Sequence, residues 1–271
     1  APLAEWQVGS TYTVQISPSV TGPLGTDQPI SWQFSTAVPQ ATAFSPAAED
    51  ALVSASTTSV GLTFDNAIDA VALRAAGNVQ VLEEGRELEL SEGDPAYNPD
   101  DNTVTFTPVA GLRTGTGYQV VVSRAVGGLL QQSDYSWSFS TAVPQLEQVS
   151  PADESSGVGI DLAEAVVEFS VPIDAVQVVA ANFVLLKDGQ AVALRANDPE
   201  DRGEGRYGLA PLAEWQVGST YTVQISPSVT GPLGTDQPIS WQFSTAVPQA
   251  IAFSPATDDA AVSSSTGSVS L

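Results

Sequence analysis

The phrase "SWQFSTAVPQ" occupies residues 31–40 and recurs letter for letter at 240–249, and a close relative, "SWSFSTAVPQ", stands at 136–145. The outer two occurrences belong to a longer identity, because residues 1–40 equal residues 210–249 at an offset of 209. The similarity continues from 41–62 to 250–271, with 7 differences in 22 positions. Self-similarity at a fixed period is typical of repeat proteins, so the phrase marks a repeating unit.

A second, weaker repeat has about half the length of the first. Ser-Pro pairs at 45–46, 150–151 and 254–255 are spaced by 105 and 104 residues. We therefore divide the chain into two alternating unit types, X and Y. Residues 1–40 are the C-terminal part of a Y unit, 41–144 a complete X unit, 145–249 a complete Y unit, and 250–271 the N-terminal part of a further X unit. This division suggests a segment of a longer alternating array.

Within each unit, apolar residues alternate with polar ones, which predicts strands and little helix. In "AEAVVEFSV" (163–171) the alternating residues are Ala165, Val167 and Phe169. Two-residue turns are predicted at Asp188-Gly189 and Glu84-Gly85, each between apolar runs. One helical turn is expected in 69–78 and its counterpart in 174–183. About seven short strands in roughly 105 residues predict an all-β chain of tandem Ig-like β-sandwiches in an extended array.

Tyrosine and tryptophan recur at equivalent places in these units. "WQVGSTYTVQI" (215–225) and "LRTGTGYQVVV" (112–122) both place a glycine and a tyrosine before an alternating strand. This pattern predicts a tyrosine corner, in which a buried phenol ties down the preceding turn. The tyrosines concerned are Tyr12, Tyr118 and Tyr221. The last strands predict inward-facing core tryptophans, namely Trp32, Trp137 and Trp241.

The chain resembles bacterial Ig-like domains of the kind found in S-layer proteins and large surface adhesins. The resemblance rests on "VSPADESSGVGIDLAEAVVEFSVPID" (149–174), "NTVTFTPVAGLRTGTGYQVVV" (102–122) and the closing "SWSFST" (136–141). X departs from it at "LTFDNAID" (62–69), and Y departs at "GEGRYGLAPLAEW" (203–215). The resemblance implies a β-sandwich and an extracellular, structural role at the cell surface. It implies no enzymatic activity.

The repeated phrase also contains the joint between units. Its strand "SWQFST" ends one unit, and "AVPQ" connects that strand to the next unit. Proline fixes φ and restricts the preceding residue, so a short linker that contains it is stiff and extended. Pro39, Pro144 and Pro248 occupy the three linkers. We therefore expect rigid seams.

Composition excludes several classes of function. Cysteine and histidine are absent, and Lys187 is the sole lysine, so the usual catalytic nucleophiles, bases and metal ligands are scarce. The chain carries 31 acidic and 8 basic residues, a net charge of −23, which disfavours nucleic acid as a partner. No apolar run predicts membrane insertion in this segment. Gly203, Gly205 and Gly208 match a dinucleotide-binding spacing but lack its strand–helix context, so we expect a hairpin loop there.

Acidic clusters raise the possibility of bound calcium. Clustered carboxylates suit this ion, and ions near domain junctions would stiffen a repeat protein. Aspartate is also common in turns for its own hydrogen bonding, and the spacing matches no calcium-loop motif. No cofactor or metal is therefore assigned. The candidate ligands are Asp94, Asp100, Asp101, Asp153 and Glu154.

These observations predict a non-catalytic, extracellular structural repeat protein that forms a rigid acidic rod or filament with neighbouring copies or repeats of itself. An alternative is the stalk of a giant cell-surface adhesin whose ligand-binding domain lies elsewhere. A third class, an accessory module of an enzyme, is disfavoured by the near-identity of the repeats, which suits an array better than a single spacer.

Overall fold

The computed structural model describes residues 5–21, 25, 27–249 and 254. The chain divides into two compact units, Ala1–Pro144 with Thr230–Gly234 and Gln145–Val229 with Thr235–Leu271. Apart from Ser254, the X-type segment expected at 250–271 lies outside the described residues.

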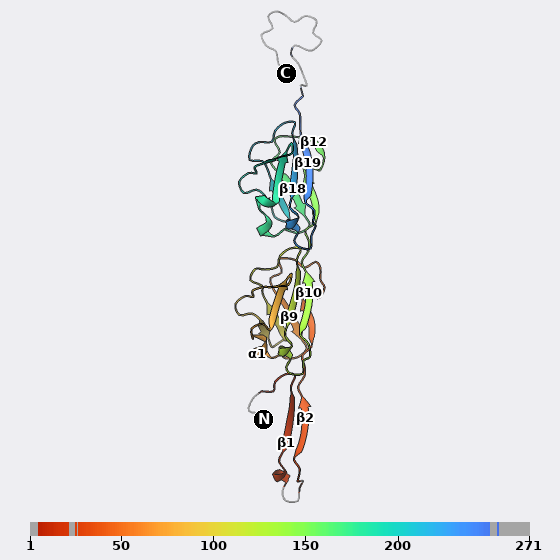
Figure 1. Cartoon of the computed structure of the whole chain (residues 1–271), viewed down its shortest axis with the longest axis vertical. Coiled ribbons are helices and arrows are strands. Elements are labelled where there is room, and N and C mark those ends of the chain that lie inside the picture. Colours follow the sequence, from red (N-terminus) through yellow and green to blue (C-terminus); the bar gives the residue numbers. More distant parts are fainter. Residues whose placement is uncertain (1–4, 22–24, 26, 250–253, 255–271) are drawn as a thin grey trace, which may run out of the picture. The chain divides into compact units, whose positions relative to one another are not determined.

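The first unit contains a sandwich of two antiparallel sheets (Figure 1). One sheet has the order β3 (Ala41–Ser45), β4 (Val60–Phe64), β8 (Thr103–Phe106) and β7 (Ala96–Asn98). The other has the order β10 (Tyr135–Ser140), β9 (Gly117–Val122), β5 (Val79–Glu83) and β6 (Arg86–Glu87). A parallel bridge joins Val53 to Thr141, so the chain that leaves the first sheet also touches the second.

The second unit repeats this arrangement. One sheet has the order β11 (Leu146–Ser150), β13 (Ala165–Phe169), β17 (Arg206–Leu209) and β16 (Glu200–Asp201). The other has the order β12 (Ser155–Val158), β19 (Ile239–Thr245), β18 (Thr220–Ile225), β14 (Phe183–Lys187) and β15 (Gln190–Val192). Strand β12 pairs in parallel with β19, and the other pairs are antiparallel. The predicted tandem Ig-like sandwiches are confirmed.

The number of strands is slightly higher than the sequence suggested. The described residues of the first sandwich contain eight strands, β3 to β10, and those of the second contain nine, β11 to β19. The surplus arises because the entering strand of Y is divided into β11 and β12, and because edge strands such as β6 and β16 are only two residues long. Short edge strands offer little free backbone for unwanted pairing with another chain.

The alternating apolar residues form the core of each sandwich. In β13, Ala165, Val167 and Phe169 are at most 1% exposed, and the intervening residues are half-buried. Strand β18 likewise buries Tyr221 and Val223 against the same core. Alternate side chains of a strand point to opposite faces, so these runs place one apolar row between the two sheets.

Both predicted two-residue turns form. Glu84 and Gly85 have φ of 47° and 82°, and Asp188 and Gly189 have φ of 49° and 81°, as the tight hairpin turn requires. The turn carboxylates also act beyond the turn: Glu84 Oε1 accepts from the Gly117 N–H at 2.9 Å, and Asp188 Oδ1 accepts from the Thr220 N–H at 2.9 Å. Each turn therefore anchors the start of the neighbouring strand.

The expected helical turn appears in two forms. In X it is α1 (Ala70–Leu73), capped by the Asp69 side chain, which accepts from the N–H groups of Val71 and Ala72. In Y it is divided into two 3₁₀ turns, η3 (Ala175–Gln177) and η4 (Ala180–Asn182). Further 3₁₀ turns that the sequence pattern did not indicate are η1 (Pro18–Thr21), η2 (Arg124–Gly127) and η5 (Pro227–Thr230).

The N-terminal segment forms a two-stranded hairpin of β1 (Thr11–Ile16) and β2 (Ile30–Ser35), the red and orange arrows of Figure 1. Its register matches that of β18 and β19, since Val14 lies opposite Trp32 as Val223 lies opposite Trp241. The identical sequences therefore adopt the same local pairing in both places.

Candidate functional site: the corner and seam of each repeat

Each predicted corner tyrosine accepts a hydrogen bond from the backbone N–H five residues before it. The distances are 2.6 Å from Gln7 to Tyr12, 2.6 Å from Arg113 to Tyr118, and 2.9 Å from Gln216 to Tyr221. The bond holds the loop that precedes the strand. In X, the Tyr118 hydroxyl also lies 3.4 Å from Oε1 of the buried Glu83.

A threonine after the last strand completes the corner. Thr141 Oγ1 accepts from the Thr116 N–H at 3.0 Å and donates to the carbonyl of Arg113. In Y, Thr245 Oγ1 accepts from the Ser219 N–H at 3.0 Å and donates to Gln216 O at 2.6 Å. Sequence reasoning missed this role, although the threefold repetition of "FST" was a signal for it. We call these tyrosine–threonine pairs the corner clamp.

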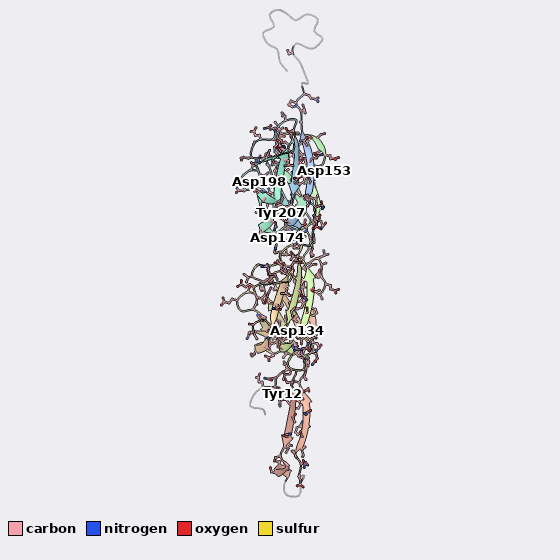
Figure 2. The ribbon with its side chains drawn as sticks, in the orientation of Figure 1. Tyr12, Asp134, Asp153, Asp174, Asp198 and Tyr207 are labelled. Carbon is pink, nitrogen blue, oxygen red and sulfur yellow. The ribbon has the colours of Figure 1, made fainter. Side chains whose placement is uncertain are left out.

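The same clamp forms in the N-terminal hairpin. Thr36 Oγ1 accepts from the Ser10 N–H at 2.9 Å and donates to Gln7 O at 2.7 Å. Figure 2 labels Tyr12, the tyrosine of this copy. In every copy, one loop residue thus has its N–H held by the tyrosine and its carbonyl held by the threonine.

The predicted core tryptophans differ in their burial. Trp137 and Trp241 are 4% and 3% exposed, whereas Trp32 is 48% exposed. The expectation of a core position is therefore wrong for Trp32. The physical reason is that β1 and β2 form a two-stranded sheet, with no second sheet packed over it among the described residues.

The seam prolines also differ from one another. Pro39 and Pro144 are buried, and Pro248 is exposed. The Pro39 carbonyl accepts from the buried hydroxyl of Tyr135 at 2.7 Å. Burial raises the pKa of Tyr135, and the nearby charge of Asp65 adds to the effect. The phenol therefore stays protonated and can donate to the seam.

The residue after each of the two buried seam prolines, Pro39 and Pro144, is fixed to the residue that follows a neighbouring strand. In X, the Gln40 N–H donates to Asp65 Oδ1 at 2.8 Å, and the Asp65 N–H donates to Gln40 O at 3.0 Å. In Y, the Gln145 N–H donates to Ser170 Oγ at 3.0 Å, and the Ser170 N–H donates to Gln145 O at 2.9 Å. The bond from Gln40 is the main cause that lowers the pKa of Asp65.

Glycines meet backbone to backbone at the seam within the first unit. The Leu130 N–H donates to Gly9 O at 2.7 Å. A Cβ on Gly9 would lie 2.0 Å from Gly127 O, and one on Gly128 would lie 2.0 Å from Val8 O. Both Gly9 and Gly128 have positive φ, 51° and 84°. Only glycine allows this approach, which joins the N-terminal corner loop to the X sandwich.

The first unit contains a second contact of this kind. Its segment Thr230–Gly234 brings the Leu233 N–H to 2.8 Å from Gly115 O. A Cβ on Gly115 would lie 2.1 Å from Thr230 O, and one on Gly231 would lie 2.3 Å from Thr114 O. Gly9 and Gly115 occupy equivalent positions before the corner tyrosines, so the contact recurs with the repeat.

Three of the five acidic residues proposed as calcium ligands, Asp94, Asp101 and Asp153, accept backbone N–H groups with their side chains. Asp94 Oδ2 accepts from the Thr107 N–H at 2.6 Å, and Asp101 Oδ1 accepts from the Thr103 N–H at 3.0 Å. The Asp100 N–H donates to Asn98 Oδ1 at 3.1 Å. Across the described part of the chain, no group of three or more acidic side chains is arranged to hold a metal ion.

The second cluster is also part of a turn. Asp153, labelled in Figure 2, accepts at Oδ1 from the N–H groups of Gln242 at 2.9 Å and Glu154 at 3.0 Å. Glu154 has a φ of 59°. The dinucleotide-like glycines fall at the β16–β17 hairpin, where Glu200 pairs with Gly208, as expected for a hairpin loop.

Comparison with known proteins identifies the repeated unit. Residues 37–141 and 142–245 each match the family described as "Bacterial Ig-like domain". None of the curated proteins matches the chain.

Among solved structures, domains 1–6 of the surface layer protein SbsC are 16% identical, with a TM-score of 0.28 over 80% of this chain and 27% of that chain. The titin I-band fragment I67–I69 is 15% identical, with a TM-score of 0.27 over 79% of this chain and 66% of that one. The chain thus spans little more than a quarter of the SbsC structure. The two family matches cover more than half of the chain, which therefore belongs to the bacterial Ig-like domain family and contains two consecutive copies of that domain.

Proposed function

We propose that this chain is part of a non-catalytic, extracellular structural protein of the bacterial cell surface, in which alternating Ig-like domains form a rigid, acidic rod or filament. Its work is mechanical. Each sandwich is held by its apolar core, each corner loop by its clamp, and the linkers at Pro39 and Pro144 by hydrogen bonds to residues beside the adjacent strands. The partners are neighbouring repeats or copies of the same protein.

The contact between Gly9 and Gly128 is the observation that supports this proposal most strongly. A flexible tether would leave the corner loop free of the next domain. Here the backbone of the corner loop at Gly9 lies against the backbone of Gly127 and Gly128, with no room for a methyl group on Gly9 or Gly128. Steric contact at this distance resists bending more effectively than exposed polar contacts, because packed backbone cannot move aside as a side chain can.

The negative net charge of the chain supports a rod that stays separate from molecules that are not its partners. With 31 acidic and 8 basic residues, surfaces that are not partners repel one another, which favours solubility over nonspecific association. The same charge disfavours nucleic acid as a partner. Within the described residues, no helix is both long enough and apolar enough to cross a membrane.

A distance distribution between two spin labels tests the rigidity. The chain has no cysteine, so two can be introduced at exposed strand positions, Gln33→Cys in β2 and Gln119→Cys in β9. We expect a narrow distribution in the parent chain. The variant Gly128→Ala should broaden it, because the added Cβ meets Val8 O at 2.0 Å and forces the seam apart.

The matched control is Gly111→Ala. Gly111 also has a positive φ, 70°, but an added Cβ would find nothing within 4 Å. Gly111→Ala therefore introduces the same kind of backbone strain as Gly128→Ala without a steric collision. A broad distribution in the parent chain would overturn the proposal, as would equal effects of the two alanine variants.

The stalk of a surface adhesin is the alternative. Exposed apolar residues of the second unit, such as Ile160, Val176 and Leu212, lie in separate loops and turns, and a free stalk needs no continuous apolar patch. Electron microscopy of native material separates the two functions: bundled strands support a filament, and single strands that end in a distinct head support a stalk.

A further inference from the structure

The same edge of the sandwich carries opposite charge in the two unit types. Counted from the glycine of the hairpin turn, residues 83–92 of X correspond to residues 187–196 of Y, and we call these segments the X edge and the Y edge. The X edge, EEGRELELSE, has five glutamates and one arginine. The Y edge, KDGQAVALRA, has one aspartate, one arginine and the sole lysine of the chain.

Three exposed glutamates of the X edge are replaced by exposed alanines in the Y edge. The pairs are Glu87 and Ala191, Glu89 and Ala193, and Glu92 and Ala196. The two sandwiches share their sheet order around this edge, so the fold itself does not require the difference. We therefore looked for its reason outside the sandwich.

Both edges lie at the end of a sheet. Strand β6 is the last strand of its sheet in X, and β15 is the last strand of its sheet in Y. Beyond β15 the chain crosses to the other sheet, where Ala193 O accepts from the Leu212 N–H at 2.7 Å. Strands of two or three residues offer little backbone for pairing, so side-chain charge and shape must supply most of any contact made here.

The two cations of the Y edge have no carboxylate partner within the chain. Lys187 Nζ bonds to Gln216 Oε1 at 2.5 Å, and Arg195 Nη1 donates to the carbonyl of Ala163 at 3.0 Å. Neither residue forms an ion pair with any described residue, whereas Arg86, Arg202 and Arg206 do. A lysine has three donors and an arginine has five, so both can also bind a carboxylate of another molecule.

Two hollows beside the Y edge share Val192. One has a volume of about 410 Å³, and its lining includes the exposed Leu212. The other has a volume of about 300 Å³, and its lining includes Val184. Glu214 is the one acidic residue that lines either of them. Apolar hollows beside an open strand accept alternate side chains of an incoming strand, which adds shape to the recognition by charge.

We propose that the Y edge is a docking surface for the X edge of a second copy of this chain. The inference rests on the proposed function only in taking neighbouring copies as the partners. Equivalent edges that meet side by side are related by a two-fold rotation, so the two segments run antiparallel. Glu87 and Glu89 then face the alanine-bearing segment between Lys187 and Arg195, where no long side chain competes for the space.

Charge selects this pairing over the two alternatives. Two X edges would bring their glutamates together, and two Y edges would bring together cations that already lack partners. Charge complementarity suppresses such wrong pairings and fixes the register of the right one. In a chain of net charge −23, the Y edge is a place where the repulsion between copies is locally reversed. The alternation of X and Y gives one chain both members of the pair.

Sedimentation equilibrium of charge-exchanged variants of the full chain tests the proposal. Ala191→Glu with Ala193→Glu gives the Y edge the glutamates of X, and Glu87→Lys with Glu89→Lys makes the X edge cationic. Each double variant alone opposes like charges, so we expect its self-association to be at least tenfold weaker than that of the parent chain. A mixture of the two should associate again, because each variant edge then meets an edge of opposite charge.

The matched control is Gln224→Glu with Gln242→Glu. It adds the same charge as the Y-edge variant, at exposed positions of β18 and β19 in the same sheet, away from the edge. We expect less than a twofold change in self-association. The control therefore separates the charge of the edge from the net charge of the chain.

Three outcomes would overturn the proposal. They are a parent chain that stays monomeric up to about 1 mM, edge variants that associate as strongly as the parent, and a control that weakens association as much as the edge variants do. Sedimentation measures association, whereas the spin-label distances measure rigidity within one chain. A rigid chain that stays monomeric would remove this docking surface and leave the rod, and a flexible chain that associates through its edges would do the reverse.

Discussion

At the scale of single residues, the corner clamp fixes one loop residue of each repeat by two side-chain hydrogen bonds. Both backbone polar groups of Arg113 are satisfied by side chains, the N–H by Tyr118 and the carbonyl by Thr141. Gln216 is held in the same way by Tyr221 and Thr245. A buried backbone group left unpaired costs about 1–3 kcal/mol, so the hydroxyls matter more than their size suggests.

The Thr141 hydroxyl gives the first prediction. Thr141→Val keeps the shape of the side chain but removes the acceptor for Thr116 N–H and the donor to Arg113 O, so we expect a loss of about 2 kcal/mol. Thr141→Ser keeps the hydroxyl and loses one buried methyl group, worth about 0.8 kcal/mol. Native-state hydrogen exchange of Gly117–Val122 measures both. Equal losses in the two variants would mean that packing, and not hydrogen bonding, explains the effect.

At the scale of strands and turns, the local patterns predicted most of the fold. Period-two alternation predicted strands such as β13, and the Glu84-Gly85 and Asp188-Gly189 pairs predicted the hairpin turns, because each feature depends on neighbouring residues alone. The 3₁₀ turns η2 and η5 were missed, since their sequences lack an apolar period. The exposure of Trp32 was also missed, because burial depends on a second sheet and not on the strand's own letters.

The clamp and the glycine contacts were missed for a similar reason. Thr141 contacts a loop 25 or more residues away, and Gly128 contacts Val8 and Gly9 across a far longer separation. Neither residue has a local signature that distinguishes it from an ordinary strand threonine or turn glycine. Repetition alone marked the positions, and the three-dimensional structure was needed to give them partners.

The second prediction concerns the first linker bond of each unit. In X the acceptor is the titratable side chain of Asp65, and in Y it is the hydroxyl of Ser170. Hydrogen bonding from Gln40 lowers the pKa of Asp65 relative to the unfolded chain, so the carboxylate stabilises the folded X sandwich above its unfolded pKa of about 4. This contribution is lost as the pH falls through the lowered, folded-state pKa. Y has Ser170 at the equivalent place and no such titration. The protection factors of the β3 and β4 amides, which correct for the intrinsic pH dependence of exchange, should therefore fall in acid.

The variant Asp65→Ser isolates this contribution from the other carboxylates. It converts the X entry to the Y form, in which a hydroxyl accepts the backbone N–H without titrating. We expect the parent and the variant to converge in stability as the pH falls below about 4 and through the lowered folded-state pKa of Asp65. A constant difference over this range would show that the charge of Asp65 has no part in holding the entry.

At the scale of the whole molecule, the charge excess limits how the repeats associate. Apart from the Asp65 carboxylate at the X seam and Glu83 beside Tyr118, the described corners and seams are built from backbone groups, hydroxyls and glycines, which carry no charge. Most of the 31 acidic residues are therefore available to repel other molecules without weakening the contacts that hold the repeats. This separation of roles supports the proposed rod, because neighbouring repeats on one chain stay joined while separate chains of the same kind repel one another.

The same excess gives the last prediction, on salt and calcium. Screening of like charges should raise the melting temperature as NaCl is added, since exposed charges farther apart than about 10 Å are largely screened at 0.1 M. The carboxylates of Asp94, Asp101 and Asp153 already accept backbone N–H groups, so we expect CaCl2 and MgCl2 of equal ionic strength to give the same increase, and a chelator to change nothing. Calorimetry measures all four conditions. An increase specific to calcium, reversed by the chelator and abolished by Asp153→Asn, would instead establish an ion at this turn and make seam stiffness depend on it.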